Sequence, residues 1–383
     1  MCSAMGRGKV MRIAVKNIPQ QSPGFDYILL GAVILLASLG LLMVFSASGI
    51  VAEKLFGDKY ALFWKQTTFM GLGFLVLVAA MRTNMEFFYQ HTYLWLLLVI
   101  ILLLLTIFSP LGNKAGGAAR WLKLGPISVQ PLEAAKIALV FYLSYFFANK
   151  QDKVKSFSVG FLPPIMMTGL LCIILMLQPD FGGALFLAGL LFLLCLVGGT
   201  RIIFLASALM LAIFPVIRMV THSPYRIRRV ASFLDPFKDA QDSGYQLVQS
   251  FYGLGSGGWL GLGLGEGKQK LFFLPEAHND FIMAVVGEEL GFLGISVIII
   301  LLGVVIWRTI SISIHQDTLQ DRITAFGMGA IIILGGLLNI GVVLGAIPSK
   351  GVPMPFFSYG GSHLIGAFFC SGILLNLSRK VRP

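Results

Sequence analysis

The chain has 383 residues, of which 57% are hydrophobic and only 12% charged, and its formal net charge is +12. A soluble domain carries about 25% charged residues, so this composition excludes an ordinary water-soluble protein. Apolar runs of about 20 residues recur along the whole length, as transmembrane helices require; a transmembrane β-barrel would show short alternating segments. The four cysteines lack metal-ligand spacing, which argues against a zinc site. We therefore predict an all-α polytopic membrane protein.

Residues 1–26 form a basic tail, and residues 27–383 are predicted to be a single membrane domain. The apolar run that starts at Tyr27 is too long for the core of a signal peptide, so we interpret it as an uncleaved first helix. About ten transmembrane helices are expected from the apolar runs, at residues 27–48, 62–81, 92–109, 131–148, 158–177, 183–199, 201–221, 281–307, 322–347 and 358–377.

The placement of basic residues predicts how these spans are oriented. An even number of spans puts both termini on one side of the membrane. Segments on that side hold fourteen Lys and Arg residues, and the short loops on the opposite side hold seven. Because basic residues concentrate in cytoplasmic segments, both termini are predicted to be cytoplasmic.

A large loop at residues 222–280, between the seventh and eighth spans, is then extracytoplasmic. Its basic residues Arg226, Arg228 and Arg229 could attract an anionic ligand or meet membrane lipid headgroups, and the sequence leaves both open. Eight of the fifteen residues in 253–267 are glycine. They formally contain GxGxxG, but no strand precedes the motif, so a dinucleotide site is rejected. The glycines indicate close backbone packing or a mobile loop.

Ionisable residues inside apolar spans are costly and therefore mark candidate sites. Glu133 and Lys136 follow Pro131, which suits a first helical turn, and their spacing puts both side chains on one helix face. They could form a structural ion pair or line a polar cavity. Glu288 and Glu289, within the eighth span, must likewise be paired or face a cavity.

Three residues in predicted outside segments carry further charges. Asp180 follows a proline at the start of an apolar run and is predicted to cap a helix. Arg120 could hold a phosphate group. Lys350 adds a cation beside the last span, where it could line the site or belong to a connector stiffened by prolines.

Asp280 lies where the eighth span begins. An ionised carboxylate that faces a water-filled mouth could act as a general base. A helix cap is the alternative, and the local pattern alone favours the cap. The neighbouring His278 could be a second base or a hydrogen-bonding group within the loop.

The motifs that carry these candidates occur in a fixed order along the chain. They are Gly-Ala-Ala-Arg-Trp (117–121), Gln-Pro-x-Glu-x-x-Lys (130–136), Gln-Pro-Asp-x-Gly (178–182), Asp-Pro-Phe-Lys-Asp-Ala-Gln (235–241), Gly-Tyr-Gln (244–246), Leu-Pro-Glu-Ala-His-Asn-Asp-Phe-Ile (274–282), Gly-Glu-Glu-Leu-Gly (287–291) and Pro-Phe-Phe-Ser-Tyr-Gly-Gly-Ser (355–362). In this order they resemble the SEDS family (shape, elongation, division and sporulation). The Pro-Glu-Ala-His and Pro-Ser-Lys-Gly segments look more like the cell-division branch than the elongation branch.

The resemblance implies a peptidoglycan glycosyltransferase that polymerises lipid II on the outer face of the cytoplasmic membrane during septal wall synthesis. It implies Asp280 as the catalytic base, with Glu133 and Lys136 lining the same cavity. Arg120 or Lys136, or a divalent cation such as Mg²⁺ or Mn²⁺, would stabilise the leaving pyrophosphate. The residues themselves identify no metal site or other cofactor.

The implied partners are lipid II, a class B penicillin-binding protein and other division proteins; no nucleic acid is expected. A lipid II flippase, an elongation-type polymerase and a non-catalytic scaffold stay open as alternatives. The chain departs from the family pattern at Ala119, Leu132, Asn279 and His363. These departures leave the acidic and basic candidates in place and leave the detailed substrate contacts open.

Overall fold

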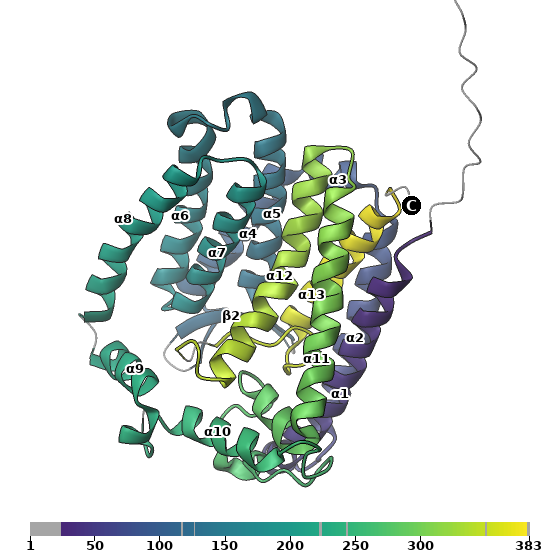
Figure 1. Ribbon diagram of the computed structural model, residues 1–383, viewed down its shortest axis with the longest axis vertical. Coiled ribbons are helices and arrows are strands. Elements are labelled where there is room, and N and C mark those ends of the chain that lie inside the picture. Colours follow the sequence, from purple (N-terminus) through teal and green to yellow (C-terminus); the bar gives the residue numbers. More distant parts are fainter. Residues whose placement is uncertain are drawn as a thin grey trace, which may run out of the picture.

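The computed structural model describes residues 24–115, 118–125, 127–221, 224–242, 244–348 and 351–380. Long helices form a bundle, and shorter helices lie across one end of it (Figure 1). Within these described ranges, seven helices are long and apolar enough to cross a membrane, and three shorter apolar helices coincide with the remaining predicted spans. The ten are α1 (Tyr27–Phe56), α2 (Ala61–Arg82), α4 (Thr92–Phe108), α5 (Pro131–Asn149), α6 (Leu162–Leu177), α7 (Phe181–Val197), α8 (Ile202–Thr221), α11 (Ile282–Ile314), α12 (Leu319–Val343) and α13 (Gly361–Ser378). The all-α polytopic fold is confirmed.

Helices α5, α12 and α13 form the buried centre of the bundle, whereas only 22% of the most apolar stretch of α2 and of α11 is buried. Helix α2 packs along α13, α1 along α11, and α12 lies between α5 and α11. Apolar side chains on the outer helices face hydrocarbon at no cost, so the polar groups of the chain gather in the centre or at the helix ends. A short helix, α3 (Met85–Gln90), connects α2 to α4.

Both ends of the described chain lie on the same side of the bundle. The backbone N–H of Asp26, just before α1, donates to Oγ of Ser378 at the end of α13 at 3.1 Å. Nearby, Lys380 forms an ion pair with Asp321 at 2.8 Å. The described ends therefore meet, as an even number of spans requires.

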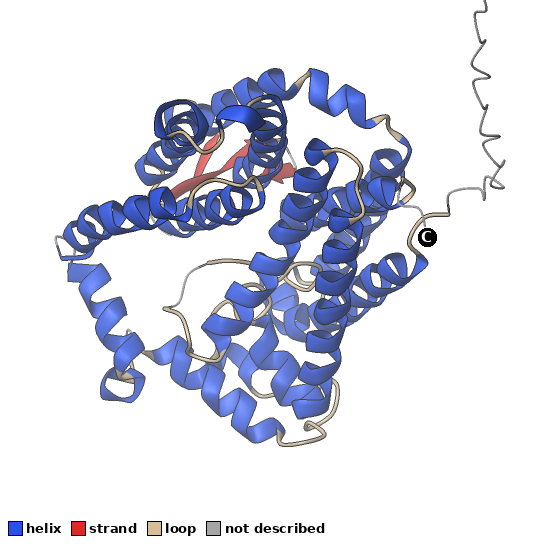
Figure 2. Cartoon of the chain, turned by 45° about the horizontal axis from the view of Figure 1, so that its top comes forward, coloured by secondary structure: helices blue, strands red, loops and turns tan. Residues whose placement is uncertain are grey.

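The connection between α4 and α5, predicted as a loop, instead forms a small antiparallel sheet (Figure 2). Its strands are β1 (Gly112–Ala115), β2 (Ala118–Leu124) and β3 (Ile127–Val129), in the order β1-β2-β3. Trp121 pairs with Asn113 across β1–β2, and Leu122 pairs with Val129 across β2–β3. Leu122 is buried, and its strand β2 packs against α4 and α5.

The long segment between α8 and α11 is largely helical. It contains α9 (Pro224–Leu234), a 3₁₀ turn (Pro236–Asp239), α10 (Tyr245–Gly257) and a turn of π-helix (Gln269–Phe273). Helix α10 packs on α11. A Cβ atom at Gly257 would lie 1.9 Å from the carbonyl oxygen of Gly287, so only glycine permits this approach. Of the two roles predicted for the glycines, close backbone packing is the one observed there.

Helix α11 is broken at Gly291, where φ is 66° and ψ is −164°. Residues 258–263 satisfy the backbone groups that the break releases. The N–H of Leu262 donates to the carbonyl of Glu288 at 2.9 Å, and the N–H of Phe292 donates to that of Gly258 at 2.9 Å. A broken helix is tolerated in a membrane protein when neighbouring backbone makes such bonds.

Candidate functional site

The first two turns of α5 hold a buried ion pair. Pro131 occupies the first turn of this helix. Nζ of Lys136 lies 2.7 Å from Oε1 of Glu133, and both side chains are less than 10% exposed. The same ammonium lies 4.3 Å from the ring centre of Phe186 on α7, close enough for a cation–π interaction. The prediction that Glu133 and Lys136 share one face is confirmed.

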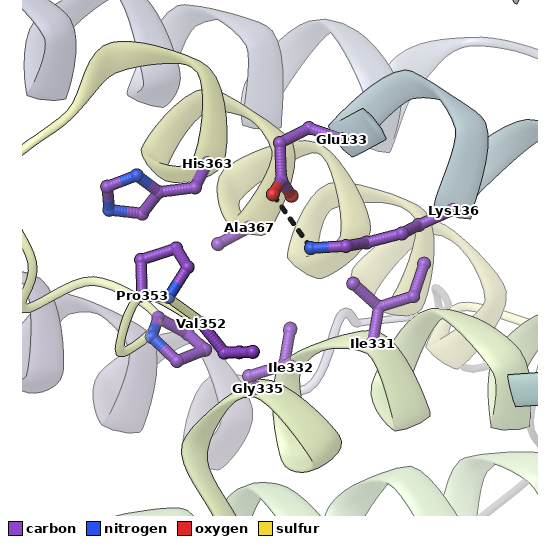
Figure 3. A pocket seen from close by; sticks show the side chains of 10 residues that line it. Glu133, Lys136, Ile331, Ile332, Gly335, Val352, Pro353, His363 and Ala367 are labelled. Carbon is purple, nitrogen blue, oxygen red and sulfur yellow. Dashed lines mark hydrogen bonds and ion pairs between the residues drawn. The ribbon is translucent and has the colours of Figure 1, made fainter. Parts of the chain in front are cut away.

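This pair lines a small cavity between α5, α12, α13 and the segment before α13 (Figure 3). Its volume is about 20 Å³, room for about one water molecule. Glu133 and Lys136 supply the charged part of its wall. The full lining is Glu133, Lys136, Ile331, Ile332, Gly335, Val352, Pro353, Pro355, His363 and Ala367.

His363 also lines the cavity, although the sequence marked it only as a departure from the family pattern. Its imidazole lies across the cavity from Lys136 (Figure 3). The ring is buried, and Nε2 lies 2.8 Å from the carbonyl oxygen of Ser358. A polar residue one turn inside an apolar span was the available signal.

Asp280 is half-buried, and it is not among the residues that line this cavity. Helix α11 begins at Ile282 with Phe281 in the N-cap position, so the interpretation of Asp280 as the cap of that helix is wrong. A Cβ atom at Gly351 would lie 3.1 Å from Oδ2 of Asp280. Because residues 352 and 353 line the cavity, the segment 351–353 joins the Asp280 carboxylate to the Glu133–Lys136 pair.

His278 is also half-buried, with its ring centre 6.0 Å from that of Tyr359. Burial lowers the pKa of His278, and the charge of Glu276 opposes this shift in part. His278 is therefore uncharged near neutral pH. Lys350, the remaining candidate of this face, lies outside the described residues.

Arg120 is tied to a neighbouring loop and is not part of the cavity lining. Its Nη2 donates to the carbonyl of Pro179 at 2.6 Å, and its Nε lies 3.6 Å from Oδ1 of Asp180. Asp180 accepts from the N–H of Gly183 at 3.1 Å, so its predicted role as the N-cap of α7 is confirmed. The side chain of Arg120 is 36% exposed and stays accessible to an anion.

A second buried polar cluster lies where α1 meets the segment after α10. Nζ of Lys270 lies 2.7 Å from Oε1 of Glu289, and Oγ of Ser46 donates to Oε2 of Glu289 at 2.6 Å. Glu288 accepts from the backbone N–H of Lys268 at 2.8 Å. Of the two alternatives predicted for these residues, Glu289 is paired, with Lys270. Glu288 has no cation partner among the described residues and is held instead by the backbone N–H groups of Lys268 and Gln269.

This cluster borders a larger groove of about 350 Å³ between α1 and residues 264–270. Leu42, Phe45 and Ile50 form its apolar wall, and Lys270 lies at its base. Within the described ranges, no three His, Cys, Asp or Glu side chains are grouped as metal ligands.

The fold and the site define a polytopic membrane protein with a half-buried carboxylate beside a cavity that holds a buried ion pair. The chain belongs to the FtsW/RodA/SpoVE family of cell cycle proteins, whose model matches residues 27–383.

Relatives and solved structures agree with this assignment. A probable peptidoglycan glycosyltransferase FtsW of Trichlorobacter lovleyi is 40% identical over 358 residues, covering 94% of each chain. The stage V sporulation protein E of Bacillus subtilis is 37% identical, covering 93% of this chain and 98% of that one. A chain from a peptidoglycan synthase complex superposes with a TM-score of 0.79 at 27% identity, over 93% of this chain and 98% of that one. Thermus thermophilus RodA superposes with a TM-score of 0.70 at 25% identity, over 94% and 98%.

Proposed function

We propose that this chain polymerises lipid II into glycan strands and uses Asp280 as the general base of that reaction. Its FtsW relatives are named as probable peptidoglycan glycosyltransferases. The supporting observation is the position of Asp280. Its carboxylate lies against Gly351, and the next two residues of that segment line the cavity with Glu133 and Lys136. A half-buried carboxylate beside this segment can face both substrate and solvent.

The chemical step is a displacement at the anomeric carbon of the donor sugar. The 4-hydroxyl oxygen of the acceptor sugar forms the new bond to that carbon, and its proton passes to the carboxylate of Asp280. The bond from the anomeric carbon to the pyrophosphate oxygen breaks, and the undecaprenyl pyrophosphate leaves with the electron pair. Asp280 then returns the proton to solvent.

Lys136 and Arg120 are the cations that we assign to the leaving pyrophosphate. Lys136 uses one of its three N–H donors on Glu133, which leaves two for a phosphate oxygen. Because its cavity has room for about one water molecule, this contact requires the cavity to widen when the substrate binds. Arg120 is partly exposed, donates a hydrogen bond to the carbonyl of Pro179 and forms an ion pair with Asp180, so it would contact the substrate from the edge of the site. Uncharged His278 would bind the acceptor as a hydrogen-bonding group, and Lys350 would add charge on the same face.

The site faces the outside of the cytoplasmic membrane in this proposal, and both termini are cytoplasmic. The meeting of Asp26 with Ser378 supports a common side for the two ends, and the distribution of Lys and Arg supports the cytoplasm as that side. The likeness to a chain of a peptidoglycan synthase complex supports a class B penicillin-binding protein as partner. The likeness to FtsW relatives supports action at the division septum.

The test is a polymerisation assay with the purified chain, its transpeptidase partner and lipid II in detergent. The native pair should produce glycan strands on a gel, and Asp280→Asn should produce none. Asp242→Asn is the matched control, because Asp242 is an exposed carboxylate of the same long segment; it should polymerise as the native chain does. Lipid II binding without polymer from the native pair would favour transport over polymerisation.

A further inference from the structure

Three consecutive backbone carbonyls, those of residues 278–280, accept hydrogen bonds from groups far along the chain. The first accepts from the backbone N–H of Tyr359 at 2.9 Å. The second accepts from Oγ of Ser358 at 2.7 Å, and the third accepts from Nδ2 of Asn339 at 2.8 Å. The donors belong to α12 and to the segment before α13. The loop that carries Asp280 is therefore held at three consecutive residues, 278–280.

Ser358 connects this loop to the cavity of the Glu133–Lys136 pair. It is fully buried, and its Oγ also accepts from the N–H of Met354 at 2.7 Å. Its own carbonyl accepts from Nε2 of His363, a cavity residue, at 2.8 Å, and from Nε2 of Gln66 at 3.3 Å. Each polar group of Ser358 thus has a fixed partner, and one partner lines the cavity.

Asn339 holds Asp280 from two directions. Its Nδ2 donates to the carbonyl of Asp280 and also to the carbonyl of Val352 at 2.9 Å. Val352 follows Gly351, the residue against which the Asp280 carboxylate lies. Asn339 is buried, and its Oδ1 has no hydrogen-bond partner among the described residues. A buried unpaired oxygen is costly, and a leucine at this position would avoid that cost. The contribution of the asparagine is therefore the two hydrogen bonds that its Nδ2 donates.

We propose that Ser358 and Asn339 are positioning residues that hold the carboxylate of Asp280 at the cavity. Neither residue contacts substrate; each acts through the backbone of residues 279–280 or through Val352. Displacement of a reacting group by about 1 Å can slow a reaction about 100-fold, so a loop carrying the base needs such support. The inference rests on the proposed role of Asp280.

The test compares Ser358→Ala and Asn339→Leu with Ser250→Ala in the assay with the partner and lipid II. Ser250 is a matched control, because it is equally buried and its Oγ donates to the carbonyl of Val343 at 2.9 Å, where α10 meets α12. We expect kcat to fall at least tenfold in the first two variants with KM within about twofold, and to be unchanged in Ser250→Ala. Ser358→Cys, which retains a weak donor, should give an intermediate kcat.

Thermal unfolding in detergent checks that each variant is folded. A lower unfolding midpoint without a fall in kcat does not support the positioning role. If Ser358→Ala does not fold, Asn339→Leu carries the same test, because its bonds act on the adjacent residue. A kcat within twofold of native in Asn339→Leu, or a loss confined to KM, would overturn the positioning role. Asp280→Asn is assayed in parallel. If Asp280→Asn is inactive while the Ser358 and Asn339 variants are active, the positioning role fails and the base assignment stands. If Asp280→Asn is active, the base assignment itself is overturned.

Discussion

The ammonium of Lys136 lies 2.7 Å from a carboxylate oxygen of Glu133, and both side chains are buried in the first turns of α5. Removal of one partner would leave an uncompensated buried charge, which costs about 3–5 kcal/mol. We therefore expect Glu133→Leu to lower the free energy of unfolding by about that amount. Denaturant unfolding in detergent, followed by circular dichroism, measures the loss.

The double variant Glu133→Leu with Lys136→Met is the control for that prediction. It removes both charges and leaves no unpaired ion, so it should be more stable than either single variant. Its polymerase activity should still be lost, since the proposed pyrophosphate contact is gone. A double variant no more stable than the single variants would show that the pair does not act as a unit.

The second ion pair gives a prediction with a neighbouring control. Lys270→Met leaves the carboxylate of Glu289 buried without its cation, so it should destabilise the protein by about 3–5 kcal/mol. The side chain of Lys268 is exposed, and Lys268→Met should change stability by less than about 0.5 kcal/mol. Equal effects of the two substitutions in the same unfolding measurement would contradict the pairing of Lys270.

Two glycines of α10 should respond to alanine in opposite directions. A Cβ at Gly257 would meet the carbonyl of Gly287 at 1.9 Å, whereas a Cβ at Gly255 would meet nothing within 4 Å. Gly257→Ala must push α10 from α11 and should cost about 1–3 kcal/mol. Gly255→Ala should stabilise by about 0.5–1 kcal/mol through helix propensity. Thermal midpoints that move in the same direction would refute this packing.

The stability of the protein should depend on pH through His278. Burial lowers its pKa in the folded state, so below the usual value of about 6.5 the unfolded chain takes up a proton that the folded chain does not. Stability therefore rises with pH through the window between the lowered pKa and about 6.5, and it falls on acidification below about pH 6.5. His278→Asn should weaken this fall in the thermal midpoint between about pH 7 and pH 5. His315→Asn, at an exposed histidine, should retain it.

The membrane fold could be predicted from the sequence because apolar runs report directly on helices that face hydrocarbon. Local spacing likewise predicted the Glu133–Lys136 pair and the cap at Asp180, since both interactions span three residues. The sheet at residues 112–129 was missed, because its strands are short and lie within a predicted loop. Residues 222–280 could not be resolved into helices, since their glycines obscure the apolar periodicity of α10.

The surroundings of Asp280 could not be predicted from the sequence. Its carbonyl is held by Asn339, and its carboxylate lies against Gly351, about 60 to 70 residues away along the chain. Such contacts depend on how α11 and α12 pack, which no local pattern reports. The cap interpretation was wrong because α11 begins two residues after Asp280, and helix starts are uncertain by about two to four residues from sequence. The polar side chains of Asn339 and His363 within apolar spans were the available signals of a polar network.

The rate of glycan-strand growth at saturating lipid II, compared between the native chain and Asp280→Asn with the same partner, tests the general base most directly. Loss of a general base slows a reaction about 10²–10⁴-fold, and the amide keeps the size of the side chain. We predict a fall of that size, with lipid II affinity within about twofold of native. Strand growth in Asp280→Asn within twofold of the native rate would contradict the assignment of Asp280 as the base.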